Sequence, residues 1–323
     1  MKTIAIVAGG DSPEYEVSIK SATEVSAALS SKYFVYVIII RGKSWYWEDS
    51  KGRYFGIDKN DFSLQTDDMK IRFDAVFIAI HGTPGENGPL QGYFDMLGIR
   101  YTGCSASCSA LTFNKQACKM FLKEYNIPMA TGKLVRKSDN IDIDELAATI
   151  GFPCFVKPND SGSSFGVSKV KSKEEIIPAL DKAFKESNEA LIEVYMNGKE
   201  VACGVVKVKG KTMVLPITEI ISGNEFFDYE AKYTPGKSNE ITPANLSKEV
   251  TEEVQRLSAE IAELLDCYGI VRVDFIIIDS KPFFLEINTV PGMTKESLIP
   301  QQAKAMGVST TELYSMIVED VLD

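Results

Sequence analysis

The sequence predicts a mixed α/β protein of more than one domain, and three observations support this class. Runs of β-branched and aromatic residues alternate with helical patterns along the chain, as in proteins whose sheets are covered by helices. At 323 residues, the chain is long enough for two or three domains. Hydrophobic residues make up 45% of it and charged residues 25%, an ordinary globular composition that excludes a disordered or fibrous protein.

The charge and the apolar runs narrow the choice of partners. Acidic residues outnumber basic residues 45 to 35, and the resulting formal charge of −10 argues against a nucleic-acid partner. The longest apolar run, Phe34–Ile40, is too short to cross a membrane, and the apolar stretch at the N-terminus is too short for a signal peptide. We therefore expect a soluble, cytoplasmic protein of the size of an enzyme, without a membrane partner.

The first section of the chain begins with a βαβ pattern. Thr3–Ala8 and Phe34–Ile40 are predicted strands with a helical pattern between them, which indicates a parallel sheet with a right-handed crossover. Ala75–Ile80 is a further buried strand, and the Gly- and Pro-rich loop HGTPGENGPLQG follows it. After a helix near Leu90–Leu97, a run of small residues begins at Gly103, so we place an N-terminal α/β domain at residues 1–103.

Two further sections follow, predicted as a central domain (residues 104–196) and a C-terminal domain (residues 197–323). The central section has helical patterns at Asn114–Tyr125 and Lys173–Glu186 and strands at Thr131–Val135, Cys154–Lys157 and Ala190–Tyr195. The C-terminal section has strands near Glu200–Val208, Thr212–Thr218, Gly269–Ile278 and Pro282–Ile287 and a helix near Lys248–Leu265. Inside the C-terminal section, after the strand near Thr212–Thr218 and before the helix, a polar segment at about residues 221–246 lacks periodicity. This is typical of a functional loop.

The cysteines predict neither disulfides nor a metal site. The chain has six cysteines and one histidine, and only Cys104 and Cys108 have a spacing that could suit a metal. No second pair follows at such a spacing, so we expect reduced, mostly buried thiols.

The segment VKPNDSGSSFGVSKV, residues 156–170, is a candidate phosphate-binding hairpin. Neither a P-loop nor a G-x-G-x-x-G motif is present. The serine elbow G-x-S-x-G is matched formally at Gly162–Gly166, but a hydrolase needs a helix after the serine and a late histidine, and His81 lies upstream. A strand that ends at Lys157, a Gly/Ser turn and a returning strand would instead offer N–H groups and hydroxyls to phosphate oxygens. An ordinary polar hairpin remains the alternative.

Two strands near the C-terminus, VRVDFIIID and FFLEINTVPGM, carry a second candidate site. Arg272 and Asp274 alternate with apolar residues on the first, and Glu286 and Asn288 do so on the second. Carboxylate and amide oxygens on one sheet face suit Mg²⁺ together with substrate phosphates, and Arg272 could neutralise developing negative charge. A solvated face with salt bridges is the alternative.

With these segments, the sequence resembles the D-alanine–D-alanine ligases of the ATP-grasp superfamily over nearly its full length. The resemblance lies in GGDSPEYEVSI, HGTPGENGPLQG, FNKQACK, VKPNDSGSSFGVSKV, FFDYEAKY, VRVDF and LEINTVPGMTKESLIP. It implies an ATP-grasp fold preceded by a parallel-sheet domain, with a lid loop at about residues 221–246. It also implies ATP and two Mg²⁺ (or Mn²⁺) ions as cofactors, a homodimer, and a role in peptidoglycan precursor synthesis.

The resemblance also implies a role for individual residues. The ATP-binding residues would be Lys115, Lys157, Ser164, Glu193, Glu200 and, in the lid, Lys232. The metal ligands would be Asp274, Glu286 and Asn288. The catalytic residues would be Glu16, Ser163 and Tyr233, joined by hydrogen bonds, with Arg272 and the N–H of Gly292 as the oxyanion hole. The D-alanine substrates would contact Glu16, His81, Ser297 and Leu298.

For four of these residues, a purely structural role is the alternative. Glu16 could simply complement a helix dipole, His81 could be a buried structural histidine, Tyr233 a loop anchor and Lys115 a solvated helix lysine. The pattern Glu230-Ala231-Lys232-Tyr233 in the lid favours an amino acid over D-lactate as the second substrate, by resemblance. D-serine is left open as that substrate, as are other ATP-grasp ligases and a nucleotide-binding regulator without catalysis.

Overall fold

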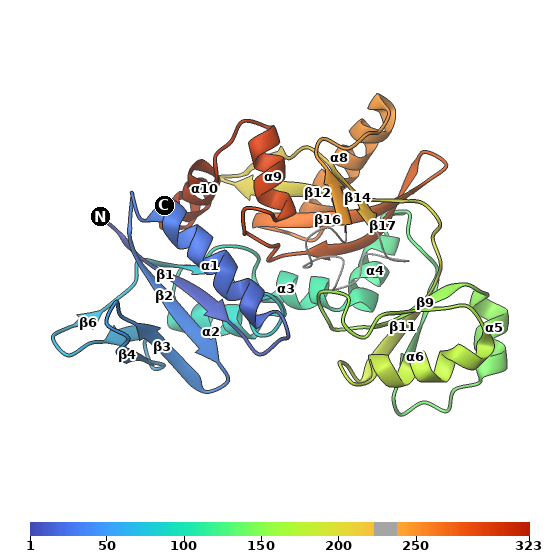
Figure 1. The fold of residues 1–323 in the computed structure, drawn as a ribbon, viewed down its shortest axis with the longest axis horizontal. Coiled ribbons are helices and arrows are strands. Elements are labelled where there is room, and N and C mark those ends of the chain that lie inside the picture. Colours follow the sequence, from blue (N-terminus) through green and yellow to red (C-terminus); the bar gives the residue numbers. More distant parts are fainter. Residues whose placement is uncertain (223–237) are drawn as a thin grey trace.

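The chain folds around three β-sheets, which follow one another along the sequence (Figure 1). The structure is a computed structural model that describes residues 1–222 and 238–323. Within these residues, the N-terminal sheet has seven strands, the central sheet four and the C-terminal sheet six.

The N-terminal sheet begins with the predicted βαβ unit. β1 (Thr3–Gly9) pairs in parallel with β2 (Phe34–Arg41) on one side and with β7 (Ala75–Ile78) on the other. α1 (Tyr15–Leu29) connects the first two strands. The mixed α/β class with an N-terminal parallel sheet is therefore confirmed.

Four short strands extend this sheet beyond β2, and the sequence analysis did not predict them. They run antiparallel to one another, so only the inner part of the sheet is parallel. They are β3 (Ser44–Glu48), β4 (Tyr54–Asp58), β5 (Ser63–Gln65) and β6 (Lys70–Ile71).

Three helices lead from the first sheet to the second. They are α2 (Pro89–Leu97), α3 (Ala106–Phe113) and α4 (Lys115–Lys123). The central sheet is antiparallel, in the order β10 (Ser168–Val170), β9 (Cys154–Pro158), β11 (Glu189–Val194) and β8 (Gly132–Arg136). Its helices are α5 (Ile143–Ile150) and α6 (Ile176–Ala183), the latter preceded by a 3₁₀ turn at Lys173–Glu175. The hairpin of β9 and β10 confirms the predicted strand–turn–strand.

The C-terminal sheet is also antiparallel, and β16 (Gly269–Ile278) lies inside it between β12 (Lys199–Val208) and β17 (Lys281–Asn288). Helix α8 (Lys248–Leu264) packs on this sheet. The remaining strands are β13 (Lys211–Val214), β14 (Thr218–Ser222) and β15 (Ser238–Ile241). β15 pairs with β14, so the expected structureless loop at residues 221–246 is wrong at its edges; residues 223–237 lie outside the described part.

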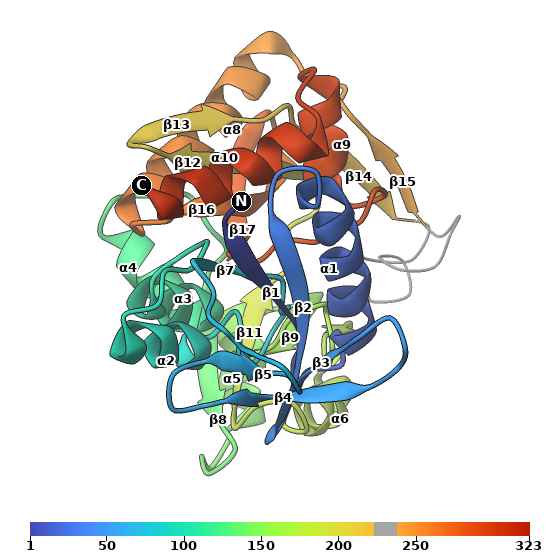
Figure 2. The same ribbon diagram turned by 90° about the vertical axis from the view of Figure 1, so that its left-hand side faces the viewer.

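The end of the chain returns to its beginning. α9 (Leu298–Ala305) and α10 (Thr310–Leu322) follow the last strand, and α10 packs on α1 and β7 of the N-terminal sheet (Figure 2). Tyr314 on α10 is fully buried in the same core as β1, and its hydroxyl donates to the carbonyl of Met293 at 3.1 Å. In the part of the chain that the structure describes, helices long and apolar enough to span a membrane are absent.

Candidate active site

Two adjoining cavities lie where the three sheets approach one another. The wide cavity has a volume of about 1120 Å³ and is lined from α1, the loop after β7, β16, β17 and the loop before α9. The narrow cavity, of about 180 Å³, lies between the central and C-terminal sheets. Their common wall consists of Lys115, Ser161, Gly162, Ser163 and Glu286. A group bound in one cavity can therefore meet a group bound in the other at these five residues.

The narrow cavity holds most of the predicted ATP-binding residues. Lys157, Ser164, Glu193 and Glu200 line it together with Lys115. Apolar side chains complete its walls: Phe155, Phe165, Met196, Ile276 and Leu285. Apolar walls with a few charges at one end are the usual form of a site for a flat ring that carries an anionic tail.

Glu193 is bound by two lysines at the end of this cavity. Lys157 Nζ lies 2.5 Å from one carboxylate oxygen of Glu193, and Lys119 Nζ contacts the other. Burial acts to raise the pKa of Glu193, but the charges of Lys157 and Lys119 outweigh burial and lower it. Two lysines on one carboxylate leave a net positive charge, which favours an anionic ligand. Lys119 was not predicted, although it follows Lys115 by one helical turn.

Lys115 lies at the start of α4, in the common wall. Its ammonium donates to the carbonyl of Ser161 and lies 3.9 Å from a carboxylate oxygen of Glu286. Burial lowers the pKa of Lys115, and Glu286 partly offsets this effect. The alternative of a solvated helix lysine is therefore wrong, because the side chain is largely buried between the two cavities.

The predicted metal ligands lie on one face of the C-terminal sheet. Asp274 stands directly opposite Glu286, and Arg272 opposite Asn288, in the antiparallel register of β16 and β17. Directly opposite side chains share a sheet face, so the sequence prediction of a single polar cluster is confirmed. Arg272 binds Asp274 through two hydrogen bonds, Nε to Oδ1 at 2.7 Å and Nη2 to Oδ2 at 2.6 Å.

This cluster offers only oxygen ligands, which suit Mg²⁺ or Mn²⁺. Asp274 is buried and paired with Arg272, but each of its carboxylate oxygens accepts one guanidinium hydrogen bond and keeps a further lone pair that suits a metal ion. Glu286, in the wall common to both cavities, is the ligand best placed to meet a phosphate.

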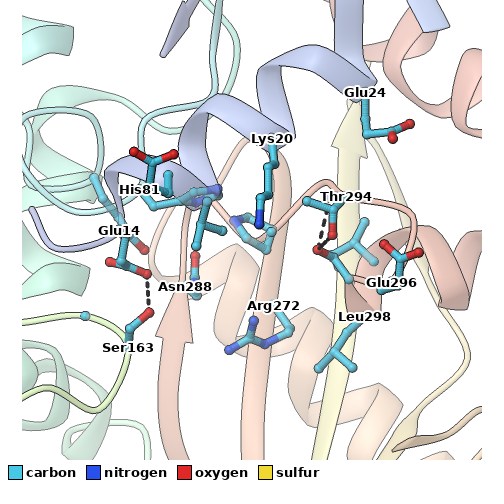
Figure 3. Close-up of a pocket in the computed structure, with 18 of the residues that line it drawn as sticks. Glu14, Lys20, Glu24, His81, Ser163, Arg272, Asn288, Thr294, Glu296 and Leu298 are labelled. Atoms are coloured by element: carbon cyan, nitrogen blue, oxygen red, sulfur yellow. Dashed lines mark hydrogen bonds between the residues drawn. The ribbon is translucent and has the colours of Figure 1, made fainter. Parts of the chain in front are cut away.

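The sequence analysis chose the wrong glutamate for the contact with Ser163. The Ser163 hydroxyl donates to the carboxylate of Glu14, which is buried just before α1 (Figure 3). Glu16 is exposed on the first turn of α1 and lines only the wide cavity. The segment DSPEYEVS contains two glutamates two residues apart, and only the three-dimensional course of the chain distinguishes them.

The turn that carries Ser163 is shaped to reach Glu14. A Cβ atom at Gly162 would lie 2.5 Å from Glu14 Oε2, so a side chain there would displace either the Glu14 carboxylate or the turn. Ser163 and Ser164 both have a left-handed backbone, with φ of 47° and 58°. Non-glycine residues rarely adopt this conformation outside constrained sites. Gly162 therefore lets the hairpin close over the common wall.

His81 lines the wide cavity, but both ring nitrogens are used inside the protein. Nδ1 lies 2.7 Å from the carbonyl of Val290, and Nε2 lies 2.9 Å from the hydroxyl of Ser21. Burial lowers the pKa of His81, so the ring is neutral and its single proton belongs on Nδ1, which faces a carbonyl. The Ser21 hydroxyl then donates to Nε2. Both hydrogen bonds of the ring are therefore made within the protein, as expected for a buried structural histidine.

Glu86 is a second buried carboxylate that the sequence analysis missed. It lies in the loop HGTPGENGPLQG, accepts the N–H of Gly82 at 2.9 Å and lines the wide cavity. Burial, and then the charge of Glu14, raise the pKa of Glu86 to about 7. Its position before a Gly-rich turn was visible in the sequence, but its burial was not.

The other end of the wide cavity carries the remaining predicted residues. Gly292, Ser297 and Leu298 line it, and Ser297 is the N-cap of α9. The Ser297 hydroxyl accepts the N–H of Thr294 at 3.1 Å. Lys20, which was not predicted, reaches into the cavity from α1 (Figure 3). Lys232 and Tyr233 lie outside the described residues.

Comparisons with known proteins agree with this arrangement. The families "D-ala D-ala ligase N-terminus" and "D-ala D-ala ligase C-terminus" match residues 3–104 and 121–319. A D-alanine–D-alanine ligase of Phocaeicola vulgatus is 48% identical over 321 residues, covering 99% of both chains.

Solved structures of similar proteins give the same result. The VanG D-Ala:D-Ser ligase of Enterococcus faecalis is 31% identical, with a TM-score of 0.87 and 98% coverage of both chains. A D-alanine–D-alanine ligase of Bacillus anthracis, solved as a complex with ATP, is 31% identical, with a TM-score of 0.80 and coverage of 100% of this chain and 98% of that one.

The fold and the paired cavities define an ATP-grasp enzyme, in which two antiparallel sheets enclose the narrow cavity. Within that class, the chain belongs to the D-alanine–D-alanine ligase family.

Proposed function

We propose that this protein joins two D-alanines into D-alanyl-D-alanine, a peptidoglycan precursor, with conversion of ATP to ADP and phosphate. The observation that carries the proposal is the common wall of the two cavities. ATP would occupy the narrow cavity, both amino acids the wide one, and the γ-phosphate would meet the first carboxylate beside Lys115, Ser163 and Glu286. Family membership supplies the choice of D-alanine.

In the first step, an oxygen of the first D-alanine carboxylate attacks the γ-phosphorus, and ADP leaves to give an acylphosphate. Lys115 and Lys157 would hold the phosphates, while Glu193 and Glu200 would contact the adenine and ribose. Glu14 would receive the ammonium of this D-alanine, in place of Glu16. These groups act by position and charge, because ATP already provides the leaving group.

Asp274, Glu286 and Asn288 fit two Mg²⁺ or Mn²⁺ ions, since they present oxygen ligands on one sheet face. Ions held there would neutralise negative charge on the ATP phosphates. Within the chain itself, Arg272 keeps the carboxylate of Asp274 in place through two hydrogen bonds.

In the second step, the amine of the second D-alanine attacks the acyl carbon, loses a proton and expels phosphate. Arg272 and the N–H of Gly292 would bind the oxyanion. The N-terminus of α9, at Ser297 and Leu298, would hold the second carboxylate, because free N–H groups at a helix start attract anions. His81 would fix the loop at Val290 that carries Gly292.

Phosphate release from ATP and Mg²⁺ tests the proposal, with D-alanine, L-alanine, D-serine or D-lactate added separately. We expect release with D-alanine alone among the single amino acids, and D-alanyl-D-alanine as the product. Equal phosphate release with D-alanine and with L-alanine would refute D-alanine as the specific substrate. ATP binding with no release under any condition would instead support a nucleotide-binding regulator.

A D-alanine–D-serine ligase is the second candidate, because the VanG enzyme is similar over nearly the whole chain. Mixtures of D-alanine with D-serine distinguish the two functions through the ratio of mixed to homogeneous dipeptide. We also propose a cytoplasmic homodimer, which the family resemblance supports and which sedimentation analysis would test.

A further inference from the structure

Three cysteines from distant parts of the chain meet behind the C-terminal sheet. Cys104 directly precedes α3, Cys108 lies on α3, and Cys267 lies between α8 and β16. Their sulfur atoms all lie within 4.8 Å of one another, and all three residues are buried. We call them the thiol cluster. Sequence spacing suggested only Cys104 and Cys108, because Cys267 follows 159 residues after Cys108.

One sulfur–sulfur and one sulfur–oxygen distance in the thiol cluster are close to those of a tetrahedral zinc site. With Zn–S bonds of about 2.3 Å, two sulfur ligands stand about 3.8 Å apart. Cys108 Sγ and Cys267 Sγ are separated by 3.7 Å. With a Zn–O bond of about 2.1 Å, a sulfur and an oxygen ligand stand about 3.6 Å apart. Cys104 Sγ lies 3.6 Å from the carbonyl oxygen of Tyr268, which supplies a fourth corner.

The surroundings of the thiol cluster favour a divalent metal ion. Three thiolates around a divalent ion leave one negative charge, whereas a monovalent ion would leave two, and buried charge is costly. The N–H of Tyr268 points at Cys104 Sγ at 3.4 Å, the type of second contact that orients a metal-bound thiolate. The side chain of Tyr268 is 42% exposed, so a path from solvent is short.

We propose that Cys104, Cys108, Cys267 and the carbonyl of Tyr268 bind a structural zinc ion, separate from the two substrate cavities. These residues are absent from the cavity walls that the described residues define. Binding replaces the thiol protons by Zn–S bonds and releases them to solvent, without oxidation. The ion would join the start of the central section to the base of β16, the strand that carries Arg272 and Asp274.

Metal analysis of the reduced, full-length protein tests this inference. After growth with zinc and dialysis against a weak chelator, we expect one zinc ion per chain. Replacement by Co²⁺ should give the near-ultraviolet bands of thiolate-to-metal charge transfer. Single substitutions Cys104→Ala, Cys108→Ala and Cys267→Ala should each lower the affinity for Co²⁺ at least about tenfold. Cys118→Ala is the matched control, because Cys118 is equally buried but outside the thiol cluster.

Two results would overturn the inference. One is folded, reduced wild-type protein that takes up neither zinc nor Co²⁺ with sulfur bands. The other is a Cys108–Cys267 disulfide in the protein as isolated, found by mass spectrometry after alkylation. If the alanine variants fail to fold, cadmium NMR on the wild type still decides, because the chemical shift reports whether three sulfur ligands are present.

Discussion

The hydroxyl of Ser163 donates a hydrogen bond to the carboxylate of Glu14 across 149 residues of sequence. The bond joins the turn of the β9–β10 hairpin to the start of α1, and thereby the central section to the N-terminal one. Both residues line the wide cavity, beside the wall that it shares with the narrow cavity. The contact therefore lies where the proposed ATP site meets the proposed amino-acid site.

Glu14→Gln should lower kcat/KM for D-alanine by about 100-fold, because it removes the charge that would bind the ammonium and weakens the bond to Ser163. Glu16→Gln is the matched control and should stay within about threefold of wild type, because Glu16 is exposed. Steady-state phosphate release measures both variants. Equal losses in the two would contradict the assignment to Glu14.

Arg272→Ala should lower kcat by about 10²–10³-fold through loss of an oxyanion donor. The same change leaves Asp274 buried without its two hydrogen bonds, so thermal stability must be measured alongside. Arg272→Lys keeps a positive charge near Asp274 and should recover stability more than kcat. A folded Arg272→Ala enzyme with nearly normal kcat would exclude the catalytic role.

Glu86 predicts a pH dependence of stability in the metal-free protein. The folded pKa of about 7 lies above the usual glutamate value of 4.5, so the folded state binds more protons than the unfolded state between these pH values and loses stability as the pH rises through them. The shift corresponds to about 3 kcal/mol above pH 7. Glu86→Gln should remove this loss and raise stability at pH 8 relative to wild type. Urea unfolding at pH 4.5 and pH 8 gives the change in the free energy of unfolding between these pH values for each protein. The same change in wild type and in Glu86→Gln would refute the prediction.

Gly162→Ala should impair catalysis without unfolding the protein. The added methyl group would meet Glu14 Oε2 at 2.5 Å and push the turn away from the common wall. We expect kcat/KM to fall at least about tenfold, since small displacements of positioning groups are costly. Gly56→Ala is the control, because a Cβ there has no atom within 4 Å. A normal Gly162→Ala enzyme would show that this approach is unimportant.

The sequence predicted the elements whose pattern is local. β16 spans Gly269–Ile278, as expected from its β-branched residues in alternation with Arg272 and Asp274, and α8 spans Lys248–Leu264, as expected from its amphipathic repeat. The face shared by Asp274 and Glu286 also followed from alternation along two strands joined by a short turn. Strands β3 to β6 were missed, because each is short and its alternation is weak.

Contacts between distant segments could not be predicted in the same way. Nothing in the local sequence distinguishes Glu14 from Glu16 as the partner of Ser163, or indicates that Lys119 shares Glu193 with Lys157. Burial is likewise a property of the whole fold. It explains why the pKa shift of Glu86 and the use of both nitrogens of His81 emerged only from the structure.

The position of α10 has a consequence for how the protein is made. This helix ends at Leu322 and covers β7 and α1 of the first sheet, with Tyr314 buried in their core. During synthesis, the N-terminal sheet therefore leaves the ribosome without this cover, and its apolar face stays open until α10 has emerged from the exit tunnel. Termination of translation before α10 would release a chain in which this face of the N-terminal sheet stays uncovered.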